Sequence, residues 1–160
     1  MKKVLFVCTG NVFRSMSAEF TMKTAAAKTP NLALAFASAG THGYPDHPIR
    51  RDVIDALATH GIKPENHQSR LLTKEILDDS DLVVAMSTDH QKFIKDTFNR
   101  ESVLFLEICE GRKDAFPDLW EVVPDYKTNP DASEQYITQA IDLVAKNGKN
   151  FLANLPKFLK

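Results

Sequence analysis

The sequence is poor in cysteine, since only Cys8 and Cys109 occur among its 160 residues. Two cysteines cannot build the disulfide framework that stabilises many small secreted domains. The N-terminus also leads directly into an apolar run, without the features of a signal peptide. These two absences favour a cytoplasmic protein.

Long apolar runs and an excess of charge of one sign are missing as well. No apolar run approaches the ~20 residues of a membrane-spanning helix, so we expect no membrane partner. With 20 basic and 21 acidic residues the formal net charge is -1, and no basic stripe is present to bind nucleic acid. The five histidines stand at positions 42, 47, 60, 67 and 90, without the Cys/His spacing of a zinc site. We therefore expect no metal, no cofactor and no nucleic-acid partner.

Short apolar runs alternate with longer segments of helical pattern along the chain. The apolar runs cover residues 4–7, 32–37, 82–86 and 103–108, and the helical patterns cover 16–28, 49–60, 88–99 and 132 to about 155, with a short turn at 73–77. This alternation is typical of βαβ units, and neither a repeat nor a linker divides the chain. The sequence therefore predicts the α/β class: a single domain over residues 1–160, with a doubly wound sheet of four parallel strands and helices on both faces.

The most informative segment lies between the first apolar run and the first predicted helix. It reads Cys8-Thr9-Gly10-Asn11-Val12-Phe13-Arg14-Ser15. A loop of this length turns its backbone N–H groups inward around a phosphate, while the N-terminus of the following helix adds positive potential. We therefore predict a phosphate-binding loop, at the carboxyl end of the first strand, with a thiol on its floor.

Each residue type in this loop has a chemical reason to be there. Cys8 would act as a thiolate nucleophile, which the loop amides and the helix dipole stabilise. Gly10 permits close backbone approach, and Asn11 tolerates the left-handed region. Arg14 offers a planar fork for two phosphate oxygens, and Ser15 can donate its hydroxyl to the thiolate. A buried structural cysteine is the alternative interpretation of Cys8, and the fixed offsets of its neighbours argue against it.

This loop resembles the signature of the low-molecular-weight protein tyrosine phosphatases, which reads approximately V-C-x-G-N-x-C-R-S-P. Further similar segments follow in the same order: Ser38-Ala39-Gly40-Thr41, Gly61-Ile62, the stretch from His67 to Leu77, and Pro124-Asp125. The resemblance implies a cysteine-dependent phosphomonoesterase with Cys8 as nucleophile, Arg14 as phosphate clamp and Asp125 as general acid. From spacing alone Asp125 would be a turn aspartate after a proline.

The resemblance also implies supporting residues and a substrate. His67 would support the serine and asparagine of the loop, and Tyr44 and Tyr126 would line a slot for a phenyl phosphate, although exposed loop tyrosines fit the sequence equally well. Val12 favours a phosphotyrosine-containing protein as substrate, because the phosphoarginine-directed branch has threonine there. Inorganic phosphate, vanadate or sulfate would bind the same loop.

The implied chemistry has two steps: Cys8 attacks phosphorus to give a cysteinyl-phosphate, and water then hydrolyses it. The acid Asp125 must be protonated while Cys8 is ionised. A bell-shaped pH profile with its optimum on the acidic side of neutrality is therefore expected.

Four positions depart from the family pattern. Phe13 stands where most members carry a second cysteine that forms a protective disulfide. Met16 replaces a proline, Ser87 stands where aspartate is frequent, and Asp125 is followed by Tyr126 rather than proline. We expect a looser loop and an altered acid segment.

Two alternative functions remain open. A thiol-dependent arsenate reductase shares this loop but needs two further cysteines, whereas this chain has only Cys109. A catalytically impaired phosphate-binding module would have kept the loop without turnover.

Overall fold

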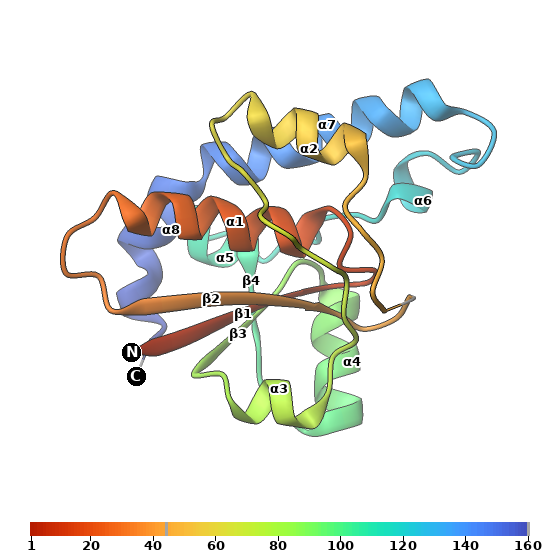
Figure 1. Ribbon diagram of the computed structural model, residues 1–160. Coiled ribbons are helices and arrows are strands. Elements are labelled where there is room, and N and C mark those ends of the chain that lie inside the picture. Colours follow the sequence, from red (N-terminus) through yellow and green to blue (C-terminus); the bar gives the residue numbers. More distant parts are fainter. Residues whose placement is uncertain (44, 160) are drawn as a thin grey trace.

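The computed structural model describes residues 1–43 and 45–159. Four parallel strands form one sheet in the order β2-β1-β3-β4 (Figure 1). The strands are β1 (Lys2–Cys8), β2 (Leu34–Gly40), β3 (Leu82–Ala85) and β4 (Val103–Leu104). The predicted sheet of four parallel strands is confirmed.

Strand β1 lies inside the sheet and is paired on both sides. Its residues Val4 to Val7 pair with Phe36 to Ala39 of β2 and with Leu82 to Ala85 of β3. A parallel strand with both faces covered needs apolar side chains at every position, which explains the unbroken run that begins at Val4. Cys8, the last residue of β1, is buried as well.

Helices cover both faces of the sheet, as predicted (Figure 1). One face carries α1 (Arg14–Ala27), α2 (Arg51–Ala58), α5 (Phe105–Glu110), α7 (Pro130–Lys146) and α8 (Gly148–Asn154), and the other carries α3 (Lys74–Asp78) and α4 (Thr88–Phe98). The core forms two clusters, one on each face of the sheet. Val4, Phe6 and Cys8 belong to the cluster on the face that carries α1, and Leu5 and Val7 belong to the cluster on the face that carries α4.

Two short elements complete the fold: α6 (Leu119–Val122) and a 3-10 turn at Leu155–Lys157. The sequence pattern did not predict α6. Among the described residues, no helix is both long and apolar enough to cross a membrane.

The apolar run at residues 103–108 was wrongly predicted as strand throughout. Only Val103–Leu104 is strand, and α5 begins at Phe105. The helix is buried on several sides, so its residues lack the one-sided pattern of an exposed helix. Gly111 ends it with a φ of 70°, the left-handed conformation that glycine adopts without strain.

The last predicted helix is divided in two. Asn129 caps α7 by accepting a hydrogen bond from the Ala132 N–H at 3.2 Å, and Pro130 occupies its first turn, as the sequence indicated. The helix is interrupted at Asn147, and α8 starts at Gly148. A Cβ at Gly148 would lie 3.0 Å from Cγ2 of Thr21, so the glycine lets α8 lie close against α1.

Candidate active site

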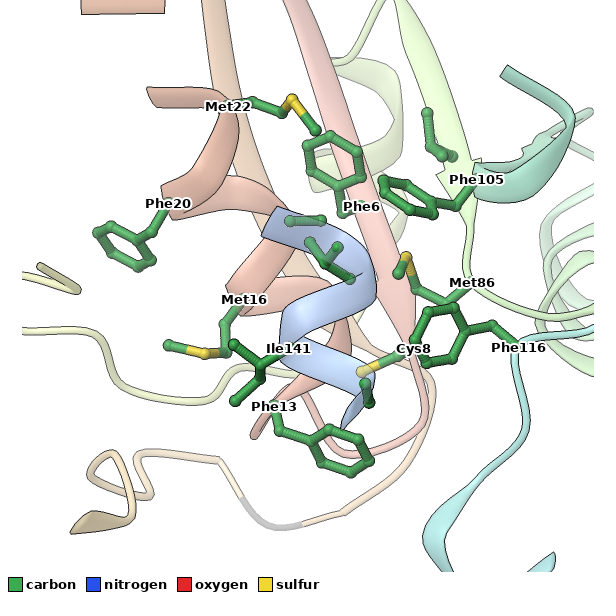
Figure 2. Packing of buried hydrophobic residues seen from close by; sticks show 14 of the residues in the cluster. Phe6, Cys8, Phe13, Met16, Phe20, Met22, Met86, Phe105, Phe116 and Ile141 are labelled. Atoms are coloured by element: carbon green, nitrogen blue, oxygen red, sulfur yellow. The ribbon is translucent and has the colours of Figure 1, made fainter. Parts of the chain in front are cut away.

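The loop that is predicted to bind phosphate joins the end of β1 to the start of α1. Cys8 is the last residue of β1 and only 2% exposed, and Arg14 is the first residue of α1. Figure 2 shows Cys8 where β1 ends, with Met86 and Phe116 beside it in the view. The predicted position at the carboxyl end of the first strand is confirmed, and such sites are usual in open α/β sheets.

Two donors face the sulfur of Cys8. The Asn11 N–H donates to Sγ at 3.3 Å, and the Ser15 hydroxyl lies 3.0 Å from Sγ. The Asn11 side-chain amide donates to the Ser15 oxygen at 2.8 Å, so the Ser15 proton is left for the sulfur or for the Ala39 carbonyl at 3.5 Å. Asn11 reaches this position with a φ of 56°, in the left-handed region that the sequence indicated. Two polar groups of the loop therefore contact the sulfur.

The loop is braced from behind by residues far away in the sequence. The Asn11 amide also donates to the Ser38 hydroxyl at 2.8 Å, and that hydroxyl donates to Glu19 at 2.5 Å. His67 Nε2 donates to the Asn11 carbonyl at 3.0 Å, and the Arg70 N–H donates to Asn11 Oδ1 at 3.1 Å. The structure thus brings His67 to the asparagine that it was expected to support.

The segment after β2 presses directly on the loop. The Thr41 N–H donates to the Cys8 carbonyl and the His42 N–H to the Thr9 carbonyl, both at 2.9 Å. A Cβ at Gly40 would lie only 2.6 Å from the Thr9 carbonyl oxygen and 3.1 Å from the Asn11 nitrogen. Only glycine permits this approach.

The Arg14 guanidinium is buried, with 1% of the residue exposed. It donates to the Phe116 carbonyl at 2.7 Å and forms an ion pair with the Asp118 carboxylate. Its Nε is buried and has no hydrogen-bond partner among the described residues. Arg14 therefore joins the loop to the segment that precedes α6.

Asp118 is the carboxylate that the structure brings to the loop, and the sequence analysis missed it. It is 8% exposed, and its Oδ2 accepts a hydrogen bond from the Thr9 hydroxyl at 2.7 Å. It also caps α6 in a capping box with Glu121. Two signals were available: a further Pro-Asp pair at Pro117-Asp118, and glutamate three residues later.

Asp125 does not join this arrangement, which corrects the prediction from the resemblance. Its side chain is exposed and accepts a hydrogen bond from the Asn129 amide at 3.2 Å. Its carbonyl accepts from the Thr128 and Asn129 N–H groups, so Asp125 belongs to the turn before α7. Among the described residues no hydrogen bond or ion pair links Asp125 to the loop.

A buried histidine touches the loop from the opposite face of the sheet. His90, in the first turn of α4, is 3% exposed, and its Nε2 lies 2.8 Å from the Thr9 hydroxyl oxygen. Burial lowers the pKa of His90 to about 3, and electrostatic interactions with Arg14 and His42 act in the same direction. The imidazole is therefore neutral near pH 7.

The aromatic residues expected at the mouth are only partly accounted for. Tyr44 lies outside the described residues. Tyr126 is half-buried and packs against the core cluster that contains Phe6 and Cys8. Its role in a substrate wall stays a prediction. Trp120, two residues after Asp118, is 49% exposed and was not singled out from the sequence.

Phe13 occupies the core rather than the site. It packs edge to face on Tyr136 with ring centroids 6.2 Å apart, and the Arg14 Cζ lies 5.6 Å from its ring centroid. Both cysteines are free, and burial raises the pKa of Cys109 to about 12. Cys109 is thus an unreactive thiol.

A buried cysteine whose sulfur contacts the Asn11 N–H and the Ser15 hydroxyl, followed by an arginine at the start of a helix, is the arrangement expected of a cysteine-based phosphate-binding site on an α/β sheet. The chain matches the family model of the low molecular weight phosphotyrosine protein phosphatases over residues 3–159. It belongs to this family.

Relatives in this family differ in activity. The chain is 37% identical over 87 residues to the low molecular weight protein-tyrosine-phosphatase Etp of Escherichia coli K12, a match that spans 54% of the chain and 55% of Etp. It is 30% identical over 148 residues to a protein-arginine-phosphatase of Bacillus subtilis, across 90% of the chain and 97% of the relative. It is 34% identical over 88 residues to an arsenate reductase of Staphylococcus aureus, across 55% of the chain and 62% of the relative.

Solved structures agree with the fold. A mutant of the arginine phosphatase YwlE with a phosphorylated active-site serine superposes with a TM-score of 0.81 at 26% identity, over 97% of this chain and 96% of that one. A low molecular weight protein tyrosine phosphatase from Bacillus subtilis superposes with a TM-score of 0.79 at 27% identity, over 97% of each chain.

The contact of Gly40 with the loop predicts the effect of Gly40→Ala. The added methyl group would push the Thr9–Asn11 backbone away from its position, so we expect a loss of stability of about 1–3 kcal/mol and vanadate binding weakened by roughly tenfold or more. Thermal unfolding and vanadate titration measure these effects. Gly10→Ala is the control for stability, because its Cβ would meet only the Val12 side chain, at 3.4 Å. Unchanged stability and binding in Gly40→Ala would contradict this account of the loop.

The lack of a second reactive thiol predicts the outcome of oxidation. Peroxide is expected to drive Cys8 to sulfinic or sulfonic acid, because Phe13 replaces the neighbouring cysteine and the Cys109 thiol is buried. Dithiothreitol should then restore little phosphatase activity, whereas a Phe13→Cys variant should recover more. Full recovery of the unmodified protein would refute this expectation.

Proposed function

We propose that this protein is a protein tyrosine phosphatase that hydrolyses phosphotyrosine and small aryl phosphates through a cysteinyl-phosphate intermediate. The observation that carries the proposal is the pair of groups that meet Cys8 Sγ and can donate to it, the Asn11 N–H at 3.3 Å and the Ser15 hydroxyl at 3.0 Å. Such donors stabilise a thiolate, which is the nucleophilic form of cysteine. The phosphorylated active-site serine in the mutant of YwlE supports a covalent intermediate at the corresponding loop.

In the first step, the Cys8 thiolate attacks phosphorus while the bond to the leaving oxygen breaks. Arg14 would hold two non-bridging oxygens with its planar guanidinium, as its position at the start of α1 favours. The phosphate would take the place that the Asp118 carboxylate occupies on Arg14. That exchange frees the carboxylate for proton transfer.

We propose Asp118, in place of Asp125, as the general acid. Its carboxylate contacts Arg14 and Thr9, so it lies beside the group that would hold the phosphate. A phenolate leaving group, whose conjugate acid has a pKa of about 10, benefits from protonation as the P–O bond breaks. In the second step Asp118 would accept a proton from water, which attacks the cysteinyl-phosphate and releases phosphate. The cycle requires Asp118 protonated and Cys8 ionised at the start, so the expected pH profile remains bell-shaped.

The choice of substrate rests on two side chains near the loop. Val12 offers no polar group for a guanidinium, and in the resemblance an aliphatic residue at this position accompanies phosphotyrosine. Trp120 follows Asp118 closely and is half exposed, and an aromatic surface of this kind suits a phenyl ring. The arginine phosphatase among the relatives makes phosphoarginine the competing substrate.

The arsenate reductase alternative receives less support. Such an enzyme passes oxidation to further cysteines, and the second cysteine of this chain is a buried thiol whose pKa is raised to about 12. The other alternative, a phosphate-binding module without turnover, is excluded if the protein hydrolyses phenyl phosphate.

Hydrolysis of phenyl phosphate tests the assigned roles directly. We expect Cys8→Ser to abolish turnover, and Asp118→Asn to lower kcat/KM by about 10²–10⁴, the usual worth of a positioned acid. Asp125→Asn is the matched control, and its kcat/KM should stay close to that of the unmodified enzyme. A large loss in Asp125→Asn with none in Asp118→Asn would restore the assignment made from the resemblance.

A second assay tests the substrate. Peptides that carry phosphotyrosine or phosphoarginine are compared by kcat/KM, and we expect phosphotyrosine to be preferred. Val12→Thr should shift the ratio towards phosphoarginine, because the hydroxyl supplies a hydrogen-bonding group where the aliphatic side chain has none. A preference of the unmodified enzyme for phosphoarginine would overturn the tyrosine assignment while leaving the cysteine chemistry intact.

A further inference from the structure

His90 is a buried polar residue that has no role in the two chemical steps proposed above. It comes from α4, on the opposite face of the sheet from α1, yet its ring reaches the loop residue directly after the nucleophile. A histidine in a core needs a reason, because burying an imidazole without compensation is unfavourable. The hydrogen bond between His90 and Thr9 indicates what that reason is.

The hydrogen bonds around Thr9 have a defined direction. A hydroxyl carries one proton and accepts at two lone pairs. The Thr9 proton goes to Asp118 Oδ2 at 2.7 Å, so His90 Nε2, at 2.8 Å, must donate to the Thr9 oxygen. Arg14 supplies a second, longer contact to that oxygen at 3.4 Å. The chain of donors therefore runs from His90 to Thr9 and on to Asp118.

The tautomer follows from this direction. With the proton on Nε2, the Nδ1 atom carries a lone pair, and it is buried without a hydrogen-bond partner in the described part of the chain. A second proton on Nδ1 would put a charge beside Arg14 and an unpaired donor into the core. The ring is consequently a fixed neutral donor rather than a titrating group.

This chain of bonds matters most once phosphate has taken the Arg14 guanidinium. Asp118 then keeps its bond from Thr9, which is adjacent in sequence to Cys8. The position of the carboxyl group relative to the sulfur thus depends on the rotamer of the Thr9 hydroxyl. Without His90, that hydroxyl would be free to turn its proton elsewhere.

We propose that His90 is a positioning residue for leaving-group protonation: by donating to Thr9, it directs the Thr9 hydroxyl at Asp118 and so holds the acid over the leaving oxygen. The proposal rests on the proposed role of Asp118. It makes α4 part of the catalytic arrangement, although no atom of His90 touches the substrate.

A dependence on the leaving group separates this role from a structural one. Phenolate needs a proton as it departs, whereas p-nitrophenolate is a much better leaving group and needs it less. We expect His90→Phe, which keeps a ring but lacks the donor, to lower kcat/KM for phenyl phosphate by about tenfold or more. The loss for p-nitrophenyl phosphate and the change in vanadate affinity should be much smaller.

Two matched variants sharpen the test. His90→Gln retains an N–H donor and should recover most of the activity on phenyl phosphate, and Thr9→Val should reproduce the leaving-group-dependent loss of His90→Phe. Equal losses on both substrates, accompanied by weaker vanadate binding, would mean that His90 only supports the loop. Activity unchanged in His90→Phe would overturn the proposal as well.

A double-mutant cycle distinguishes failure of this proposal from failure of the acid assignment. In the Asp118→Asn background, His90→Phe should cause no further loss on phenyl phosphate, because there is no acid left to position. Additive losses would refute the positioning role and leave Asp118 as the acid. If Asp118→Asn alone shows no dependence on the leaving group, the acid assignment fails, and the role of His90 fails with it.

Discussion

The site depends on the conformation of one buried residue, Asn11. Its left-handed backbone turns its N–H towards the Cys8 sulfur, and its side chain then reaches Ser15 and Ser38. Its two oxygens accept hydrogen bonds from Arg70 and His67, so every polar group of Asn11 is satisfied. A residue paired at each of its donors and acceptors has little freedom to move. Asn11 therefore keeps the loop closed around the sulfur before a substrate arrives, which lowers the reorganisation needed for attack.

A second set of contacts meets on the neighbouring residue, Thr9. Its hydroxyl joins His90 from one face of the sheet to Asp118 from the segment before α6, and Arg14 pairs with the same carboxylate. The proposed nucleophile and the proposed acid thus belong to separate networks, one through Asn11 and one through Thr9, that share a single loop. Phe13 and Met16 lie outside both networks. Phe13 packs towards Tyr136 and Met16 is buried in the core, so neither belongs to the hydrogen bonds around the sulfur.

Much of this arrangement is visible in the sequence, and what is not has physical causes. The loop could be predicted because its chemistry lies within eight consecutive residues, and β1 because a doubly covered strand is continuously apolar. The helix at Phe105 was missed because a buried helix loses its one-sided pattern. Asp118 was missed for a different reason. The chain has four Pro-Asp pairs, and only the fold decides which one approaches Arg14, because that contact joins residues 104 positions apart.

The central claim is that Cys8 becomes phosphorylated during turnover. Rapid acid quenching of the enzyme during hydrolysis of phenyl phosphate, followed by mass spectrometry of its peptides, tests this claim most directly. The account predicts one added phosphoryl group on the peptide that contains Cys8, and no phosphorylated cysteine in the Cys8→Ser variant. Sustained hydrolysis without any phosphorylated Cys8, or with the phosphoryl group on another residue, would contradict it.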